Sequence, residues 1–340
     1  MAGGQERVLK RRIKSVNSTK KITRAMELIA ASRIVRAQQA VAAARPYSEA
    51  VTEVIRHLSE GGAELSHPIL AGPASPSGRR GVIVVASDRG YAGAYNTNVI
   101  RAGERTLRAG AASTTNTAST VNSAEAADYS LYLVGRKADG YFRFRGYNVA
   151  QTFDGMSDRP SYADAKQVAT AVMAEYESGA LDRVDLAYTQ FLSVGTQKPV
   201  VRQLLPVEVG ALTEAPDTGE PKAAYEFEPE PAGILDELLP RYVESRIYAA
   251  LLDSAASEHA ARQRAMKSAT DNADDLAVRL TRIMNRARQE SITTEIMEIV
   301  SGAEAMRQAA TGGEDLLLDR THREDLFSDQ IADASRRRSN

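Results

Sequence analysis

Apolar residues near the beginning of the chain recur at alternating spacings of three and four. This pattern holds over residues 30–58 and has a period of 3.5 residues, which is typical of the seam of a coiled coil. It predicts one long helix over residues 5–58, with a bend at Pro46, where a backbone hydrogen bond is lost. Gly61 and Gly62 are expected to end this helix.

A second seam with the same alternation covers residues 235–303, with a change of phase near Met266. It predicts a helix over residues 233–305, with Pro240 as a kink or as the true start. At 1.5 Å per residue this helix would be roughly 110 Å long, which is too long for a compact domain. The helix must therefore leave the domain, and the N-terminal helix is its obvious partner. Both seams are rich in alanine, so the two backbones can approach closely.

Between the two seams the pattern changes to short apolar runs separated by amphipathic stretches. The apolar runs predict strands, and the prolines of the last run favour an edge position for it. The predicted strands cover residues 81–88, 129–135, 183–191 and 199–207. The amphipathic stretches predict helices over residues 96–109 and 162–179. Strands that alternate with helices predict a small α/β domain with a mainly parallel sheet over residues 78–210.

Three segments have no clear apolar pattern. Residues 110–127 are small, polar and low in complexity, and they are expected to form a mobile loop. Residues 211–231 are an acidic, proline-rich linker. Residues 307–340 are a C-terminal extension that is expected to be weakly ordered. The two coiled-coil helices then form separate segments over residues 1–60 and 232–306.

Charge is nearly balanced overall but is unevenly distributed. The 340 residues carry a formal net charge of −1, whereas residues 7–36 hold ten Lys or Arg and a single acid, Glu27. This basic segment predicts a local partner surface, which could suit nucleic acid, an anionic membrane or acidic groups of another protein. An aromatic content of 6%, with no aromatic residue between residues 7 and 46, disfavours nucleic acid.

The residue types that carry covalent or metal chemistry are scarce. There is no cysteine, and the four histidines have no metal-like spacing. The stretch "SDRGYAGAYN", residues 87–96, follows a predicted strand, and its Gly90 and Gly93 could hold a phosphate at a helix N-terminus. The third glycine and the acidic residue of a dinucleotide fingerprint are missing, so a simple tight turn is favoured. We therefore predict no catalytic residue, no cofactor and no metal site.

No apolar run reaches the roughly 20 residues that span a bilayer, and no secretory signal is recognisable, so a soluble cytosolic chain is expected. Three functions remain open from these patterns alone. They are a coiled-coil scaffold with an α/β head, an enzyme that uses a nucleotide in the α/β domain, and a nucleic-acid binder built on the basic segment.

Two stretches are distinctive: "KITRAMELIAASR" near the start and "RARQESITTEIMEIVSGA" near the end. Together with "VVASDRGYAGAYN" and "RYVESRIYAALLDSAASEHAARQRAMKSATDNADDL", they resemble the gamma subunit of the rotary ATP synthase, its central stalk. The resemblance covers nearly all of residues 1–306 in the same order.

The resemblance implies the fold class α/β plus a long coiled coil, in which the N- and C-terminal helices pair antiparallel with a small Rossmann-like domain between them. It implies a non-catalytic rotor without a cofactor, which transmits torque to a catalytic hexamer in a proton-driven ATP synthase. The implied partners are the alpha, beta and epsilon subunits and the membrane rotor ring, without nucleic acid. The implied location is the cytoplasmic face of a bacterial plasma membrane, through the complex alone.

The same match implies which residues meet the partners. Seven would contact the beta subunits: Lys20, Lys21, Arg24, Met26, Arg288, Gln289 and Thr293. Glu228 and Glu230 would lie where the foot of the stalk approaches the ring or epsilon. The chain departs from the family at Tyr91-Ala92, where Leu-Cys is common, and in the extension after residue 306. We expect this extension to emerge at the far tip of the hexamer.

Overall fold

The chain is described by a computed structural model that covers residues 2–60, 67–72, 78–114, 129–207 and 231–336. Most of the loop expected at 110–127 lies outside the described residues. So does the linker expected at 211–231, apart from its last residue, and with it Glu228 and Glu230. None of the described helices is long and apolar enough to cross a membrane.

Five strands form one sheet in the order β3-β2-β1-β4-β5. They are β1 (Arg80–Val85), β2 (Tyr129–Val134), β3 (Val149–Phe153), β4 (Arg183–Phe191) and β5 (Gln197–Leu205). The first four are parallel, and β5 pairs antiparallel with β4 at the edge of the sheet. The predicted α/β class with a mainly parallel sheet is confirmed.

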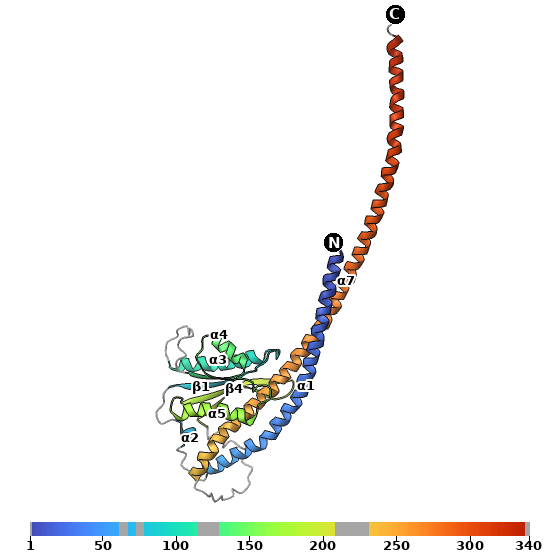
Figure 1. Cartoon of the computed structure of the whole chain (residues 1–340). Coiled ribbons are helices and arrows are strands. Elements are labelled where there is room, and N and C mark those ends of the chain that lie inside the picture. Colours follow the sequence, from blue (N-terminus) through green and yellow to red (C-terminus); the bar gives the residue numbers. More distant parts are fainter. Residues whose placement is uncertain (1, 61–66, 73–77, 115–128, 208–230, 337–340) are drawn as a thin grey trace. The chain divides into compact units, whose positions relative to one another are not determined.

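Helices cover both faces of the sheet, which explains why the central strand β1 is a continuous apolar run. Val82 and Val84 pack in a core with α3 (Tyr95–Thr114) and α4 (Arg136–Phe144). Ile83 and Val85 face the opposite core, which contains residues of α5 (Tyr162–Glu177). In Figure 1, α3 and α4 accordingly lie on one side of the sheet and α5 lies on the other.

One long helix precedes the α/β region in the sequence, and another follows it. Helix α1 spans Ala2–Glu60 with Pro46 inside it, and α7 spans Pro231–Arg336 with Pro240 inside it. A single turn, α2 (Pro68–Ala71), follows α1. Helix α7 passes the predicted end at 305 and continues through Gly312 and Gly313, and residues 307–336 contain no proline that would remove a backbone hydrogen bond.

The chain divides into two compact units, and the division cuts through both long helices. One unit is Lys21–Asp271, which holds the sheet, most of α1 and the beginning of α7. Its larger core includes Ile55 and Leu58 of α1 and Leu239 and Val243 of α7, so these parts of the long helices belong to the α/β unit. The other unit is Met1–Lys20 with Asn272–Asn340.

Within this second unit α1 and α7 pair antiparallel. The ammonium of Lys20 lies 2.6 Å from a carboxylate oxygen of Asp274. The pKa of Glu6 is lowered mainly by Lys10 and further by Arg288, which therefore lies near it. Moving from Lys20 to Glu6 on α1 thus corresponds to moving from Asp274 to Arg288 on α7, and the predicted antiparallel coiled coil is confirmed.

Candidate functional site

The predicted contact residues of α1 differ in their surroundings. Lys20 donates a hydrogen bond to Asp274, and Arg24 contacts both carboxylate oxygens of Glu27 at 2.9 Å. Lys21 is exposed, and Met26 is half-buried. The acids that meet Lys20 and Arg24 reduce the net positive charge that these two side chains present to a partner.

The predicted contact residues of α7 are all on the surface. Arg288, Gln289 and Thr293 are exposed. Arg288 lies fourteen residues beyond Asp274, the partner of Lys20, which corresponds to about 21 Å along the helix. The structure therefore does not bring Lys20 and Arg288 into one patch, and they occupy two levels of the coiled coil.

Beyond Arg288, α7 carries an apolar surface that no other described segment covers. Ile292, Ile296 and Ile299 complete the predicted seam and are 49%, 56% and 66% exposed. Helix α1 begins at Ala2, which in the same register lies at about the level of Ile292, so it does not extend along Ile296 and Ile299. A row of exposed isoleucines on one helix indicates a surface that another protein covers.

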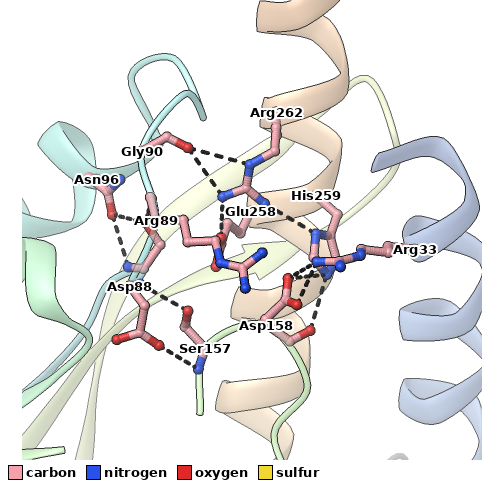
Figure 2. Close-up of polar contacts among 11 residues, drawn as sticks. Arg33, Asp88, Arg89, Gly90, Asn96, Ser157, Asp158, Glu258, His259 and Arg262 are labelled. Carbon is pink, nitrogen blue, oxygen red and sulfur yellow. Dashed lines mark hydrogen bonds and ion pairs between the residues drawn. The ribbon is translucent and has the colours of Figure 1, made fainter. Parts of the chain in front are cut away.

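A cluster of buried and half-buried polar residues joins the sheet to both long helices inside the unit Lys21–Asp271 (Figure 2). We call it the junction cluster, and it consists of Arg33, Asp88, Asp158, Glu258, His259 and Arg262. Arg33 comes from α1, the last three residues come from α7, and the two aspartates come from loops at the carboxyl ends of β1 and β3.

Asp88 fixes the loop that follows β3. Its Oδ2 accepts hydrogen bonds from the backbone N–H groups of Gly155 at 3.0 Å and Ser157 at 3.2 Å. Its own backbone N–H donates to the Ser157 hydroxyl at 2.9 Å, and its Oδ1 accepts from the backbone N–H of Arg136 at 3.2 Å. The carboxylate thus holds the loop that carries Asp158 and the start of α4.

Three residues of α7 meet these loops. The Arg262 guanidinium donates to the Gly90 carbonyl at 3.3 and 3.4 Å and contacts the Glu258 carboxylate. His259 Nε2 lies 3.2 Å from the Asp158 carbonyl oxygen, and its Nδ1 lies 3.4 Å from Arg262 Nη1. Because a carbonyl only accepts and a guanidinium only donates, these contacts require a neutral His259 with its proton on Nε2.

Burial sets the protonation of this group. It lowers the pKa of His259 to about 4, which agrees with the neutral ring that the hydrogen bonds require. Burial raises the pKa of Glu258 to about 7, although the nearby Arg262 opposes the shift. Glu258 Oε2 is buried and has no hydrogen-bond partner within the part of the chain that the structure describes.

Arg33 completes the junction cluster from α1. Its guanidinium donates to both carboxylate oxygens of Asp158, to Oδ2 at 2.5 Å. Asp158 therefore accepts from α1 through its carboxylate and from α7 through its backbone carbonyl. Because both helices hold one loop, the cluster locks the sheet to the two long helices.

Sequence patterns did not identify the junction cluster, because its members are far apart in the chain. One signal was available. The seam that includes Leu252 and Ala256 continues by its own spacing to His259, so a polar residue occupies a position that the seam marks as buried. Among the described residues no group of three or more His, Cys, Asp or Glu could hold a metal ion.

Comparisons with known proteins agree with this architecture. The family model described as ATP synthase matches residues 5–306. An ATP synthase gamma chain of Frankia casuarinae is 51% identical over 307 residues, covering 89% of this chain and 98% of that protein. The ATP synthase gamma chain of Acidothermus cellulolyticus is 49% identical over 92% of this chain and 100% of its own length.

Solved structures share the fold at low sequence identity. A chain of the Euglena gracilis mitochondrial ATP synthase, in a structure of OSCP, F1 and c-ring, is 18% identical, with a TM-score of 0.59 over 91% of this chain and 96% of that one. A chain from the central stalk and c-ring of the Tetrahymena thermophila mitochondrial enzyme is 19% identical, with a TM-score of 0.53 over 73% of this chain and 99% of that one. Because these gamma chains share about half of their residues with this chain over nearly its whole length, the chain belongs to the ATP synthase gamma chain family.

Proposed function

We propose that this chain is the non-catalytic rotor subunit of a proton-driven ATP synthase. It would transmit torque from the membrane rotor ring to a hexamer of alpha and beta subunits. The observation that carries the proposal is the apolar surface of α7 beyond Arg288, which continues the coiled-coil seam past the start of α1. A rod with such a tip needs a surrounding protein, and a ring of alternating subunits would provide one.

The coiled coil supports the proposed role because it is not symmetric. It would therefore present a different face to each of three beta subunits at any angle, which would bias their nucleotide sites differently. We propose that Lys20, Lys21, Arg24 and Met26 on α1, with Arg288, Gln289 and Thr293 on α7, make these contacts at two levels. Attraction between such exposed cations and carboxylates is worth at most about a few kcal/mol, which can guide rotation without stopping it.

The α/β unit would be the end of the rotor that meets the epsilon subunit and the ring. Glu228 and Glu230, which lie outside the described residues, are proposed for that contact because of their match to the family motif. As a subunit of such a complex the chain would be peripheral to a membrane. We propose the cytoplasmic face of the bacterial plasma membrane. The junction cluster would carry force from the sheet to the helices.

Reconstitution tests this proposal. The full chain should co-purify as one copy with three alpha and three beta subunits, and adding it should restore ATP turnover to the hexamer. A chain that binds other proteins at fixed stoichiometry without changing any ATPase would instead be a scaffold. Lys21→Ala combined with Arg288→Ala should lower turnover in the assembled complex. Arg101→Ala, an exposed arginine on α3 of the α/β unit, serves as the control.

A further inference from the structure

Phe144 lies in the last turn of α4 and is 88% exposed, the largest exposed fraction among the large apolar side chains of the described residues. Gly140, one turn earlier on the same side of α4, has no side chain, and nothing lies within 4 Å of its Cβ position. No neighbour therefore covers the Phe144 ring from that side. A single exposed apolar side chain is common in proteins, so its meaning depends on what surrounds it.

The surroundings of Phe144 on α4 are positively charged. Lys137 lies two turns earlier on the same side of the helix and is exposed. Arg143 and Arg145 flank Phe144 in the sequence, and both are exposed. The Arg145 guanidinium lies 5.6 Å from the centroid of the Tyr141 ring, which holds this cation against the end of the helix.

Helix α3 adds cations beside the same end of α4. The hydroxyls of Tyr141 and Tyr147 each donate to the Glu104 carboxylate at 3.2 Å, so the end of α4 lies next to this turn of α3. Arg105 follows Glu104 directly, Arg108 lies one turn further on, and both are exposed. We call Phe144 and the five cations the basic patch: Arg105, Arg108, Lys137, Arg143, Phe144 and Arg145.

The two acids of α3 and α4 do not neutralise the basic patch. Glu104 is bound by the two tyrosines and by Arg108 at 2.9 Å, and only 12% of its side chain is exposed. Asp139 accepts from Arg143 at 2.5 Å, and 27% of its side chain is exposed. The other three cations of the patch have no carboxylate partner among the described residues.

The positive charge is confined to one side of the sheet. On the other side, α5 contains three acids and one lysine. The cores of protein–protein interfaces are depleted of charged residues, so a patch of five cations and one apolar ring does not resemble such a core. Cations around an exposed aromatic ring are instead typical of segments that lie on anionic membrane surfaces.

We propose that the basic patch binds the headgroups of anionic phospholipids, with the Phe144 ring inserted at the level of the headgroups. The choice of lipid over nucleic acid, another polyanion, rests on the proposed function, because the rotor would work beside a membrane. Lipids in a fluid bilayer exchange places and offer no fixed binding positions. Contact with them would hold the α/β unit near the membrane without setting a preferred angle of rotation.

Fluorescence of the full chain tests the insertion of Phe144. The chain contains no tryptophan, so Phe144→Trp provides a single reporter at the patch. In about 0.15 M sodium chloride, vesicles of phosphatidylglycerol and phosphatidylcholine should shift its emission to shorter wavelength, and vesicles of phosphatidylcholine alone should not. Leu192→Trp is the control, because Leu192 is 56% exposed and follows β4, outside the patch. No shift for Phe144→Trp, or equal shifts at both positions, would overturn the proposal.

Charge variants of the Phe144→Trp chain test the cations. Removing the three cations of the patch that have no carboxylate partner should weaken binding to the anionic vesicles at least tenfold. The substitutions are Arg105→Gln, Lys137→Gln and Arg145→Gln. The matched control removes three exposed cations from the basic segment of α1 and should keep the shift. Its substitutions are Arg7→Gln, Arg11→Gln and Lys14→Gln.

Two other results would contradict the proposal. If the α1 control lost as much binding as the patch variant, the attraction of anionic vesicles would not belong to the patch. If duplex DNA changed the fluorescence of Phe144→Trp and the vesicles did not, the patch would bind nucleic acid instead. Because these measurements use the chain alone, their failure would leave the reconstitution test of the rotor unaffected.

Discussion

At the scale of single residues, the neighbours Glu258 and His259 should act in opposite directions on stability. The pKa of His259 is lowered from 6.5 to about 4, so between these values only the unfolded chain binds the proton, and acid lowers the free energy of unfolding. The pKa of Glu258 is raised from 4.5 to about 7, so the folded chain binds this proton first, and acid raises the free energy of unfolding.

We expect two variants to separate these contributions. Lowering the pH from about 7.5 to about 5 should raise the Tm of His259→Gln relative to the parent chain and lower that of Glu258→Gln. Each pKa unit corresponds to about 1.4 kcal/mol, so the differences should be measurable. Burial raises the pKa of Asp253 to about 6, but this group is common to all three proteins and cancels. Parallel Tm curves for the three proteins would contradict the assignment.

The ion pair between Arg33 and Asp158 gives a second prediction at this scale. Arg33→Ala should lower the free energy of unfolding by about 1–3 kcal/mol, because the partly buried carboxylate loses its bidentate donor. Arg33→Lys should recover only part of the loss, since an ammonium lacks the fork of a guanidinium. Denaturant unfolding measures both changes.

The matched control is Arg36→Ala. Arg36 is exposed on the same helix, one turn further along, and its removal should change the free energy of unfolding by less than about 0.5 kcal/mol. Equal effects at the two positions would mean that the Arg33 ion pair does not stabilise the junction cluster.

At the scale of elements, helix α3 packs so closely on β1 that it requires a glycine. A Cβ at Gly103 would lie 2.7 Å from a methyl carbon of the fully buried Val84. Gly103→Ala should therefore destabilise the fold by about 1–3 kcal/mol. Gly140 of α4 has open space around its Cβ position, so Gly140→Ala should stabilise the fold by about 0.5–1 kcal/mol. Thermal unfolding of both variants should show shifts of opposite sign, and a stabilising Gly103→Ala would refute the close packing.

The sequence predicted most elements because their apolar patterns were strong. It missed β3, whose five residues are mostly exposed or half-buried and so show no apolar run. It also missed α4, where four charged residues and Gly140 in nine positions hide the two buried side chains Ala138 and Phe142. It did not predict the extension of α7 beyond 305, because an apolar seam marks where a helix has a partner, whereas the backbone continues until something interrupts it.

The candidate site was only partly predictable, because it depends on residues that lie far apart in the sequence. The contact residues on α1 and α7 were predicted from the resemblance alone. Which of them are exposed, and which form ion pairs within the chain, became visible only in the fold. The junction cluster depends on three-dimensional proximity of Arg33, Asp158 and His259, which no spacing in the sequence encodes. Isolated polar residues of this kind look like surface residues until the fold brings them together.

At the scale of the whole molecule, the exposed seam of α7 should matter for assembly and not for the fold of the chain itself. Ile296 is 56% exposed, so Ile296→Asp should leave the Tm of the isolated chain nearly unchanged. In the assembled complex it would place a charge against an apolar wall, and co-purification with the alpha and beta subunits should fall about tenfold or more. Pull-down from a reconstituted mixture measures this loss.

Glu298→Gln is the control for that experiment. Glu298 is exposed on the same part of α7, and the substitution removes a charge without placing one in the seam. Assembly should be unaffected. If Ile296→Asp assembled as well as this control, the exposed isoleucines would not be a contact surface, and the proposed enclosure of the rod would be wrong.

Helix α7 passes from one unit of the chain into the other with no break in its helical backbone between Arg241, just after Pro240, and Arg336. A twist applied at one end therefore finds no hinge or loop in which to relax. It must be shared as small elastic distortions among many hydrogen-bonded turns. Such an element behaves as a torsion spring, which stores energy from abrupt steps at one end and releases it as a smoother pull at the other.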